Sequence, residues 1–191
     1  MGKRWLLVSV TTAGARPSLR VHVWRRLRGL GAHYVQQSVC LLPDREETVR
    51  AVTRLLDRVH DEGGDGRVLH LALTEESDER WLVETMSAER DDEYGEVVSR
   101  TQEFLTMERE RDRATYPEVE ESDVDLERLR KWLASIRARD YFQANGYEQA
   151  LAAVERCAKA LAEFEAEALA HELDEPKPQA RRLRAIEGGE P

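Results

Sequence analysis

Cysteine is scarce in this chain of 191 residues. Cys40 and Cys157 lie 117 positions apart, and neither has a nearby second ligand at metal-binding spacing. This pattern excludes a disulfide framework and contains no zinc-binding motif. We interpret both residues as buried free thiols, and redox or oxyanion chemistry at Cys40 is the alternative interpretation.

Long apolar runs are also missing. No segment approaches the ~20 apolar residues that a membrane-spanning helix requires. Too few apolar residues follow Met1 to form the apolar region of a secretory signal peptide. We therefore expect a cytoplasmic protein without a membrane partner. Hydrophobic residues make up 41% and charged residues 35% of the chain, which is typical of a globular protein rich in exposed helix.

Motifs for catalysis and metal binding are missing as well. The five histidines show no H-E-x-x-H pattern, and the chain has no Gly-rich phosphate loop or nucleophile elbow. The densest carboxylates, at 91–93 and 118–125, are adjacent acids of the kind that usually lie on solvated faces. We predict no enzymatic activity, no catalytic residues, no metal site and no cofactor.

Acidic residues are absent from the first 43 positions, although the whole chain has a net charge of -9. That segment holds seven basic side chains, whereas residues 44–191 hold 22 basic against 38 acidic side chains and therefore carry -16. An asymmetry of this size indicates that the two parts of the chain face different partners, or face each other.

The apolar patterns predict a strand-helix-strand-strand-helix-strand order within residues 4–73. The middle apolar segment, 34–42, has a polar centre and predicts either a hairpin or one long bent strand. A capping-box-like pair, Asp44 and Glu47, predicts the start of the second helix. The expected strands lie at 4–10, 34–42 and 68–73, and the expected helices at 17–30 and 44–62. The predicted fold class is α+β, a ferredoxin-like βαββαβ sandwich followed by an α-helical C-terminal half.

Beyond this unit the apolar residues recur only at helical spacing. Ser77 is the expected cap of one helix, whose apolar face resumes at Tyr94. A linker is expected from Tyr116 into the acidic run, with Ser122 opening the next helix and Tyr147 the last.

These patterns predict three regions of the chain. They are a ferredoxin-like domain at 1–74, a helical region at 75–173 packed on it or on a second subunit, and a flexible tail at 174–191.

The first predicted helix concentrates positive charge around a tryptophan. Arg20, Trp24 and Arg28 share one strip at i, i+4, i+8 spacing, beside the core-facing side of the helix. Arg25 lies further toward solvent, and Arg16 stands where the helix begins and its dipole adds positive charge. Clustered guanidinium groups suit phosphates and oxyanions, so these five residues are the candidate nucleic-acid or anion-binding site.

Two other interpretations of this strip stay open. Trp24 can be a packed aromatic with cation–π neighbours. The arginines can instead pair with acidic helices of the same chain or of a second copy.

Several short elements, taken in order, resemble the N-terminal region of the chromate resistance protein ChrB family. They cover roughly residues 4–145 and are most distinctive in the first 43. The elements are Trp5-Leu6-Leu7, then Arg20, Trp24-Arg25, Leu27 and Leu30-Gly31, then Val39-Cys40-Leu41-Leu42-Pro43, the stretch EGGDGRVLHLAL, and IRARDYF from Ile136 to Phe142.

The resemblance implies a ferredoxin-like domain followed by helices, in proteins associated with chromate-responsive transcription and chromate resistance. Family members carry a further C-terminal domain, which we expect this chain to lack. If chromate handling needs that domain, only the nucleic-acid or interaction role is retained. The same element order is also similar to small CRISPR-associated endoribonucleases, but residues 8–12 lack the metal-binding Asp that those enzymes place there.

The leading hypothesis is a non-enzymatic regulator or accessory protein that uses the Arg16 to Arg28 segment to bind DNA or another polyanion. A second hypothesis is an interaction module that forms a homo-oligomer, such as a dimer, and does not bind DNA. A third is an oxyanion sensor in which chromate meets Arg20 and Cys40.

Overall fold

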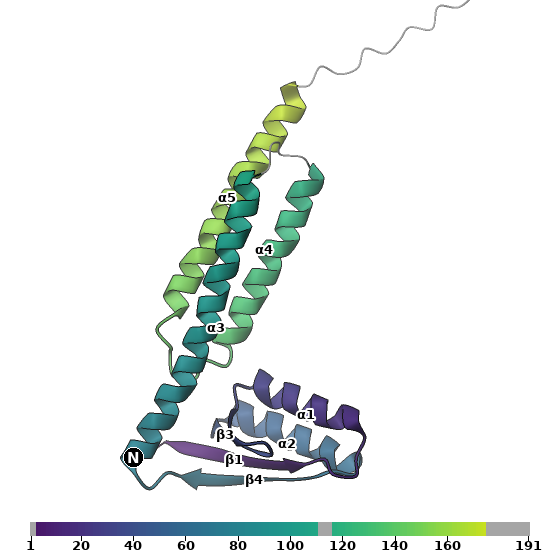
Figure 1. The fold of residues 1–191 in the computed structure, drawn as a ribbon, viewed down its shortest axis with the longest axis vertical. Helices are drawn as coiled ribbons and strands as arrows, with labels where there is room; N and C mark the ends of the chain where they lie inside the picture. Colours follow the sequence, from purple (N-terminus) through teal and green to yellow (C-terminus); the bar gives the residue numbers. More distant parts are fainter. Residues whose placement is uncertain (1–2, 111–115, 175–191) are drawn as a thin grey trace, which may run out of the picture.

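The computed structural model describes residues 3–110 and 116–174. A sheet with two helices forms one end of the molecule, and three long helices rise from it as a bundle (Figure 1). The elements in chain order are β1 (Arg4–Thr11), α1 (Pro17–Gly29), β2 (His33–Gln36), β3 (Val39–Pro43), α2 (Glu46–Asp61), β4 (Asp65–Ala72), α3 (Glu76–Glu110), α4 (Tyr116–Arg137) and α5 (Tyr147–Asp174).

The four strands form one sheet in the order β2-β3-β1-β4, and all neighbouring strands are antiparallel. In the central strand, Leu6 lies opposite Leu42 on one side and His70 on the other. The predicted strand-helix-strand-strand-helix-strand order is confirmed. Of the two alternatives for residues 34–42 the hairpin is correct, and a register shift between Tyr34 and Gln36 interrupts its pairing.

One face of the sheet packs against α1 and α2. The helix α1 contributes Leu19, Val23 and Leu27, the apolar spacing from which the helix was predicted. Each fully buried leucine or valine stabilises the fold by about 1.5–3 kcal/mol. Cys40 is buried in this core and Cys157 in the core of the bundle, so the prediction of two buried free thiols is confirmed.

The opposite face of the sheet packs against the first turns of α3. Trp5 and Leu41 from the sheet contact Leu82 and Met86 from the helix. Phe142, from the connection between α4 and α5, lies with its ring centroid 5.7 Å from that of Trp5. The bundle is therefore anchored on the sheet by the base of α3 and by this connection.

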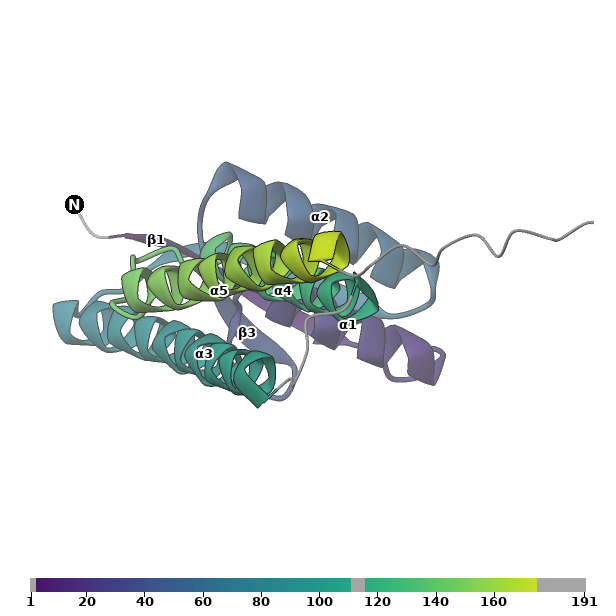
Figure 2. The same cartoon turned by 90° about the horizontal axis from the view of Figure 1, so that it is seen from above.

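The helices α3, α4 and α5 run alongside one another, and each contacts the other two (Figures 1 and 2). Small residues such as Ala150 and Ala153 are fully buried on α5, which lets its backbone approach the other helices. No helix among the described residues combines the length and apolar character needed to cross a bilayer.

The predicted start of α2 was wrong. Its N-cap is Arg45, whose backbone N–H donates to Thr48 Oγ1 at 3.0 Å, and the helix begins at Glu46. Asp44 does not cap the helix because its Oδ2 atom lies 3.1 Å from Arg4 Nε and 2.9 Å from His70 Nδ1. The Asp44 carboxylate therefore contacts side chains of β1 and β4 and does not cap the start of α2.

The predicted starts of two later helices were also wrong. Ser77 lies inside α3, and the first turn there is closed by the carbonyl of Glu75, which accepts the N–H of Asp78 at 3.2 Å. The acidic run expected in a linker belongs to α4. Ser122 is a buried residue of that helix and donates its hydroxyl to Glu108 Oε1 at 2.6 Å, so it has a partner on α3. Beyond Asp174, the predicted tail lies outside the described residues.

Candidate anion-binding groove

The helix α1 exposes its basic side because its apolar side is held in the core. Pro17 occupies the first turn, where its fixed φ suits a helix and its missing N–H is not needed. The N-cap Arg16 has no side-chain cap hydrogen bond, and the first turn contains no acidic residue. The N-terminal end of α1 therefore keeps its positive character.

All five predicted site residues are exposed, and four of them line one groove. Arg16, Arg20, Trp24 and Arg25 border a groove of about 1120 Å³ between α1 and the β2–β3 hairpin. Arg28 is not among its lining residues, but its guanidinium carbon lies over the Trp24 ring, 5.3 Å from the centroid. The indole is 48% exposed, so Trp24 has a cation–π neighbour without being buried.

The opposite wall of the groove is polar and neutral. Apart from Val10 and Ala13, it consists of Thr11 and Thr12 at the end of β1 and of Tyr34, Gln36, Gln37 and Ser38 in the hairpin. The carbonyl of Ser38 accepts the N–H of Val10 at 2.9 Å, which holds the turn against β1. The lining residues include three arginines and no carboxylate.

The arginines of the groove have no acidic partner in the part of the chain that the structure describes. Neither ion pairs nor hydrogen bonds engage the guanidinium groups of Arg16, Arg20 and Arg25 within residues 3–110 and 116–174. The contrast is with α2, where Arg50 lies 3.3 Å from Glu46 and Arg58 lies 2.6 Å from Glu62. Because the first 43 residues contain no acid, α1 offers its own arginines no acidic partner three or four positions away.

Two titratable groups lie near the groove and stay neutral. Burial, and then the neighbouring Cys40, raise the pKa of Tyr34 to about 12, although Arg28 acts in the opposite direction. Burial also raises the pKa of the Cys40 thiol to about 12. The thiol is not among the lining residues of the groove. This geometry favours a structural role for Cys40, because the reactive form of a cysteine is the thiolate.

The hairpin wall was not predicted as part of the site. The polar Gln36-Gln37-Ser38 centre is the one signal in the sequence, and it indicates a turn. The position of these three residues beside α1 depends on how the hairpin pairs with β1. Among the described residues, no three His, Cys, Asp or Glu side chains come close enough together to hold a metal ion.

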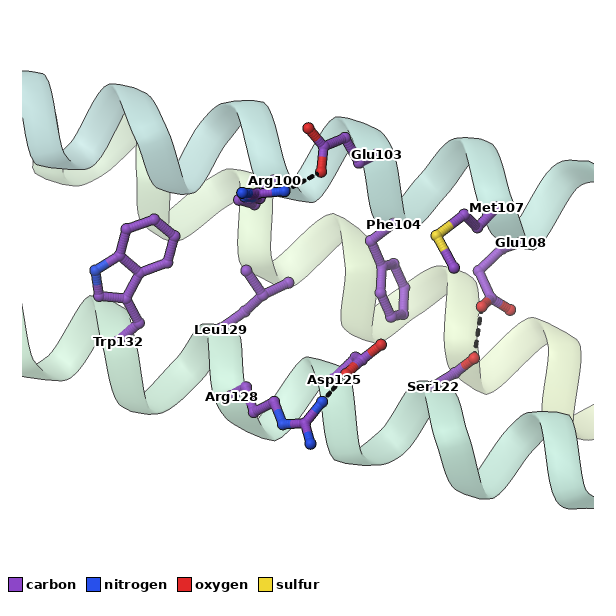
Figure 3. Close-up of a pocket in the computed structure, with 10 residues that line it drawn as sticks. All are labelled: Arg100, Glu103, Phe104, Met107, Glu108, Ser122, Asp125, Arg128, Leu129 and Trp132. Carbon is purple, nitrogen blue, oxygen red and sulfur yellow. Dashed lines mark hydrogen bonds and ion pairs between the residues drawn. The ribbon is translucent and has the colours of Figure 1, made fainter.

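A second hollow lies between α3 and α4, with a volume of about 410 Å³ (Figure 3). Phe104 and Met107 on α3 face Leu129 and Trp132 on α4 across it. Charged residues stand around these apolar side chains as two local ion pairs. These are Arg100 with Glu103 at 2.7 Å, and Arg128 with Asp125 at 2.6 Å.

Comparison with known proteins gives one finding. A family model described as "Protein ChrB, N-terminal" matches residues 20–175. The matched range begins within α1 at Arg20 and extends through α5. Neither the curated proteins nor the solved structures yielded a match.

Proposed function

Because the chain belongs to the ChrB N-terminal family, we propose that it is a regulatory or accessory protein of chromate resistance that binds DNA or another polyanion through α1. The observation that carries the proposal is the groove whose three arginines have no acidic partner among the described residues. The proposed role is non-enzymatic, cytoplasmic and concerned with transcription regulation. We also propose a ferredoxin-like topology for the N-terminal unit, supported by the antiparallel strand order β2-β3-β1-β4.

Electrostatics supports this assignment in a chain that is acidic as a whole. A nucleic acid binds where local positive charge neutralises its phosphates, and the net charge of the whole protein matters less than that patch. Arg16, Arg20 and Arg25 occupy successive turns along one groove, so each can meet a different phosphate. Each neutralised phosphate of duplex DNA contributes roughly -0.9 to the slope of log affinity against log salt.

The proposal is tested by measuring DNA affinity at several salt concentrations. The variant R20A/R25A is compared with R50A/R54A, which removes the same charge from exposed positions of α2. We expect R20A/R25A to bind more weakly and to have a slope shallower by about 2. R50A/R54A should behave as the wild type. Equal salt slopes in all three proteins would contradict binding at α1.

Chromate or another oxyanion is a smaller ligand of the same chemistry. A tetrahedral dianion suits two guanidinium groups, and Arg20 and Arg25 offer such groups on the groove side. Calorimetric titration with chromate, and with sulfate as the matched anion, tests this binding. If neither chromate nor sulfate gives a heat of binding, the oxyanion function is contradicted, whereas the proposal of polyanion binding is unaffected.

A second candidate function is self-association, and the hollow between α3 and α4 favours it. Its two local ion pairs place both signs of charge beside an apolar surface, so that the hollow can face a second copy of itself. We expect light scattering to give the mass of a dimer for the wild type and the mass of a monomer for the M107E variant. V124E is the matched control, because Val124 on α4 is equally exposed, at 51%, but does not line the hollow. A monomeric wild type would exclude this function.

A further inference from the structure

Trp24 has a basic neighbour on its own helix and also lines the groove. On one side the guanidinium group of Arg28 covers the ring, 5.3 Å from its centroid. Trp24 also lines the groove, whereas Arg28 does not. Because Trp24 is 48% exposed, a ligand in the groove can reach part of its indole ring.

An exposed indole between arginines suits a particular class of ligand. Flat aromatic rings stack on tryptophan, and negatively charged groups meet the flanking guanidinium groups. An unpaired nucleobase with its phosphates provides both in one molecule. In duplex DNA the faces of the bases are covered by their neighbours, so that a protein reaches only base edges and phosphates.

The size and the opposite wall of the groove fit the same ligand. Its volume of about 1120 Å³ is slightly above the range for small-molecule sites, roughly 300–1,000 Å³. This is room for a short stretch of single strand. Gln36, Gln37 and Ser38 carry amide and hydroxyl groups that both donate and accept hydrogen bonds, as base edges require.

We propose that the groove between α1 and the β2–β3 hairpin binds single-stranded nucleic acid, with one base stacked on Trp24. The flanking phosphates lie on Arg20 and Arg25, and Arg16 extends the contact at the start of the helix. This inference rests on the proposed polyanion binding and names the form of nucleic acid that the groove accepts.

The experiment measures fluorescence anisotropy of labelled oligonucleotides with the full chain. The probes are a 12-mer of deoxythymidine, a 12-mer of uridine and a 12-base-pair duplex of mixed sequence. The variants are W24L, W24F and W81L. Trp81 is the matched control because its indole is exposed to a similar degree, 54%, but it belongs to α3 and does not line the groove.

We expect the wild type to bind the single strands more tightly than the duplex. W24L should weaken single-strand binding about tenfold or more, W24F should retain most of it, and W81L should stay within about twofold of the wild type. Thermal unfolding of each variant checks that the fold is retained. Comparison of the thymidine and uridine probes shows whether the strand is DNA or RNA.

The outcomes separate this inference from the function on which it rests. Tighter duplex binding that is unaffected by W24L would overturn the stacking inference and leave polyanion binding at α1 in place. Single-strand binding that W24L and W81L weaken equally would also overturn it. Absence of salt-dependent binding to every probe, with R20A/R25A indistinguishable from the wild type, would overturn both.

Discussion

At the residue scale, Gly31 brings the end of α1 close to the helical bundle. Its φ is +73°, in the left-handed region that favours glycine. A Cβ atom at this position would lie 3.1 Å from both the Cβ and the carbonyl oxygen of Arg139, and 3.2 Å from Arg90 Nη1. Gly29, two residues earlier, has open space around its Cβ position and an ordinary φ.

We therefore expect G31A to lower the free energy of unfolding by about 1–3 kcal/mol. The cost has two causes, the unfavourable φ for alanine and the contact with Arg139. G29A is the control and should be neutral or stabilising by up to about 1 kcal/mol. Urea denaturation of the two variants measures the difference. Equal stability would show that the end of α1 can lie close to Arg139 without a glycine at position 31.

The buried thiol of Cys40 leads to a second prediction, which concerns how stability depends on pH. Burial raises the pKa of its thiol from an ordinary value near 9 to about 12. Below pH 9 the folded and unfolded states both keep the proton. Between pH 9 and 12 only the unfolded state loses it, so stability decreases as pH rises.

The contribution of Cys40 should approach about 1.4 kcal/mol per pH unit in that window. Urea unfolding at pH 8, 9, 10 and 11 measures the slope for the wild type and for C40A. The variant is expected to be less stable throughout but to lose stability more slowly above pH 9. Parallel curves for the two proteins would contradict the shifted pKa.

At the scale of single elements, α3 is the longest helix, with 35 residues, and it links the sheet to the bundle. Its first turns pack on Trp5, and its later turns, which include Tyr94 and Phe104, form the bundle core. Gly95 lies in the middle of the helix, is exposed, and has nothing within 4 Å of its Cβ position. Glycine in a helix interior costs stability without a packing reason here.

G95A should therefore stabilise the protein by about 0.5–1 kcal/mol. The thermal unfolding midpoint measures the gain, and G95P serves as the opposite variant, because proline in a helix interior costs about 3 kcal/mol. A destabilising effect of G95A would indicate that the helix is interrupted at this residue.

At the scale of the whole molecule, one carboxylate on α3 holds an arginine that contacts the end of α1. Glu93 on α3 lies 2.8 Å from Arg90 Nε and 3.0 Å from Arg139 Nη2. Arg139 in turn packs against Gly31, and Tyr141 donates its hydroxyl to the carbonyl of Leu30 at 2.8 Å. These contacts fix the end of α1 to the bundle.

Replacing this carboxylate should destabilise the junction. We expect E93Q to lower the free energy of unfolding by about 2 kcal/mol, because Arg90 is almost fully buried and would keep only Glu89, at 3.5 Å, as a counter-ion. E103Q is the control, since its partner Arg100 is exposed, and its effect should be below about 1 kcal/mol. Similar losses in both variants would show that the junction depends on other contacts.

Local patterns in the sequence determined the order of the elements and the two sides of α1. The apolar spacing of Leu19, Val23 and Leu27 specifies a buried face, because neighbours three and four positions apart share one side of a helix. The absence of acids from the first 43 residues likewise leaves the arginines of α1 without local partners. Such features depend on residues close together in the chain, so they can be derived without coordinates.

Other features depend on residues far apart in the chain, and packing across the fold sets them. Asp44 looked like a helix cap, but its partners are Arg4 and His70, from two strands. Ser122 also looked like a helix cap, but its hydroxyl donates to Glu108 on α3. The hairpin wall beside Trp24 and the approach of Gly31 to Arg139 arise in the same way. A short polar side chain bonds whichever group the fold brings nearest, and that group is set by packing across the molecule.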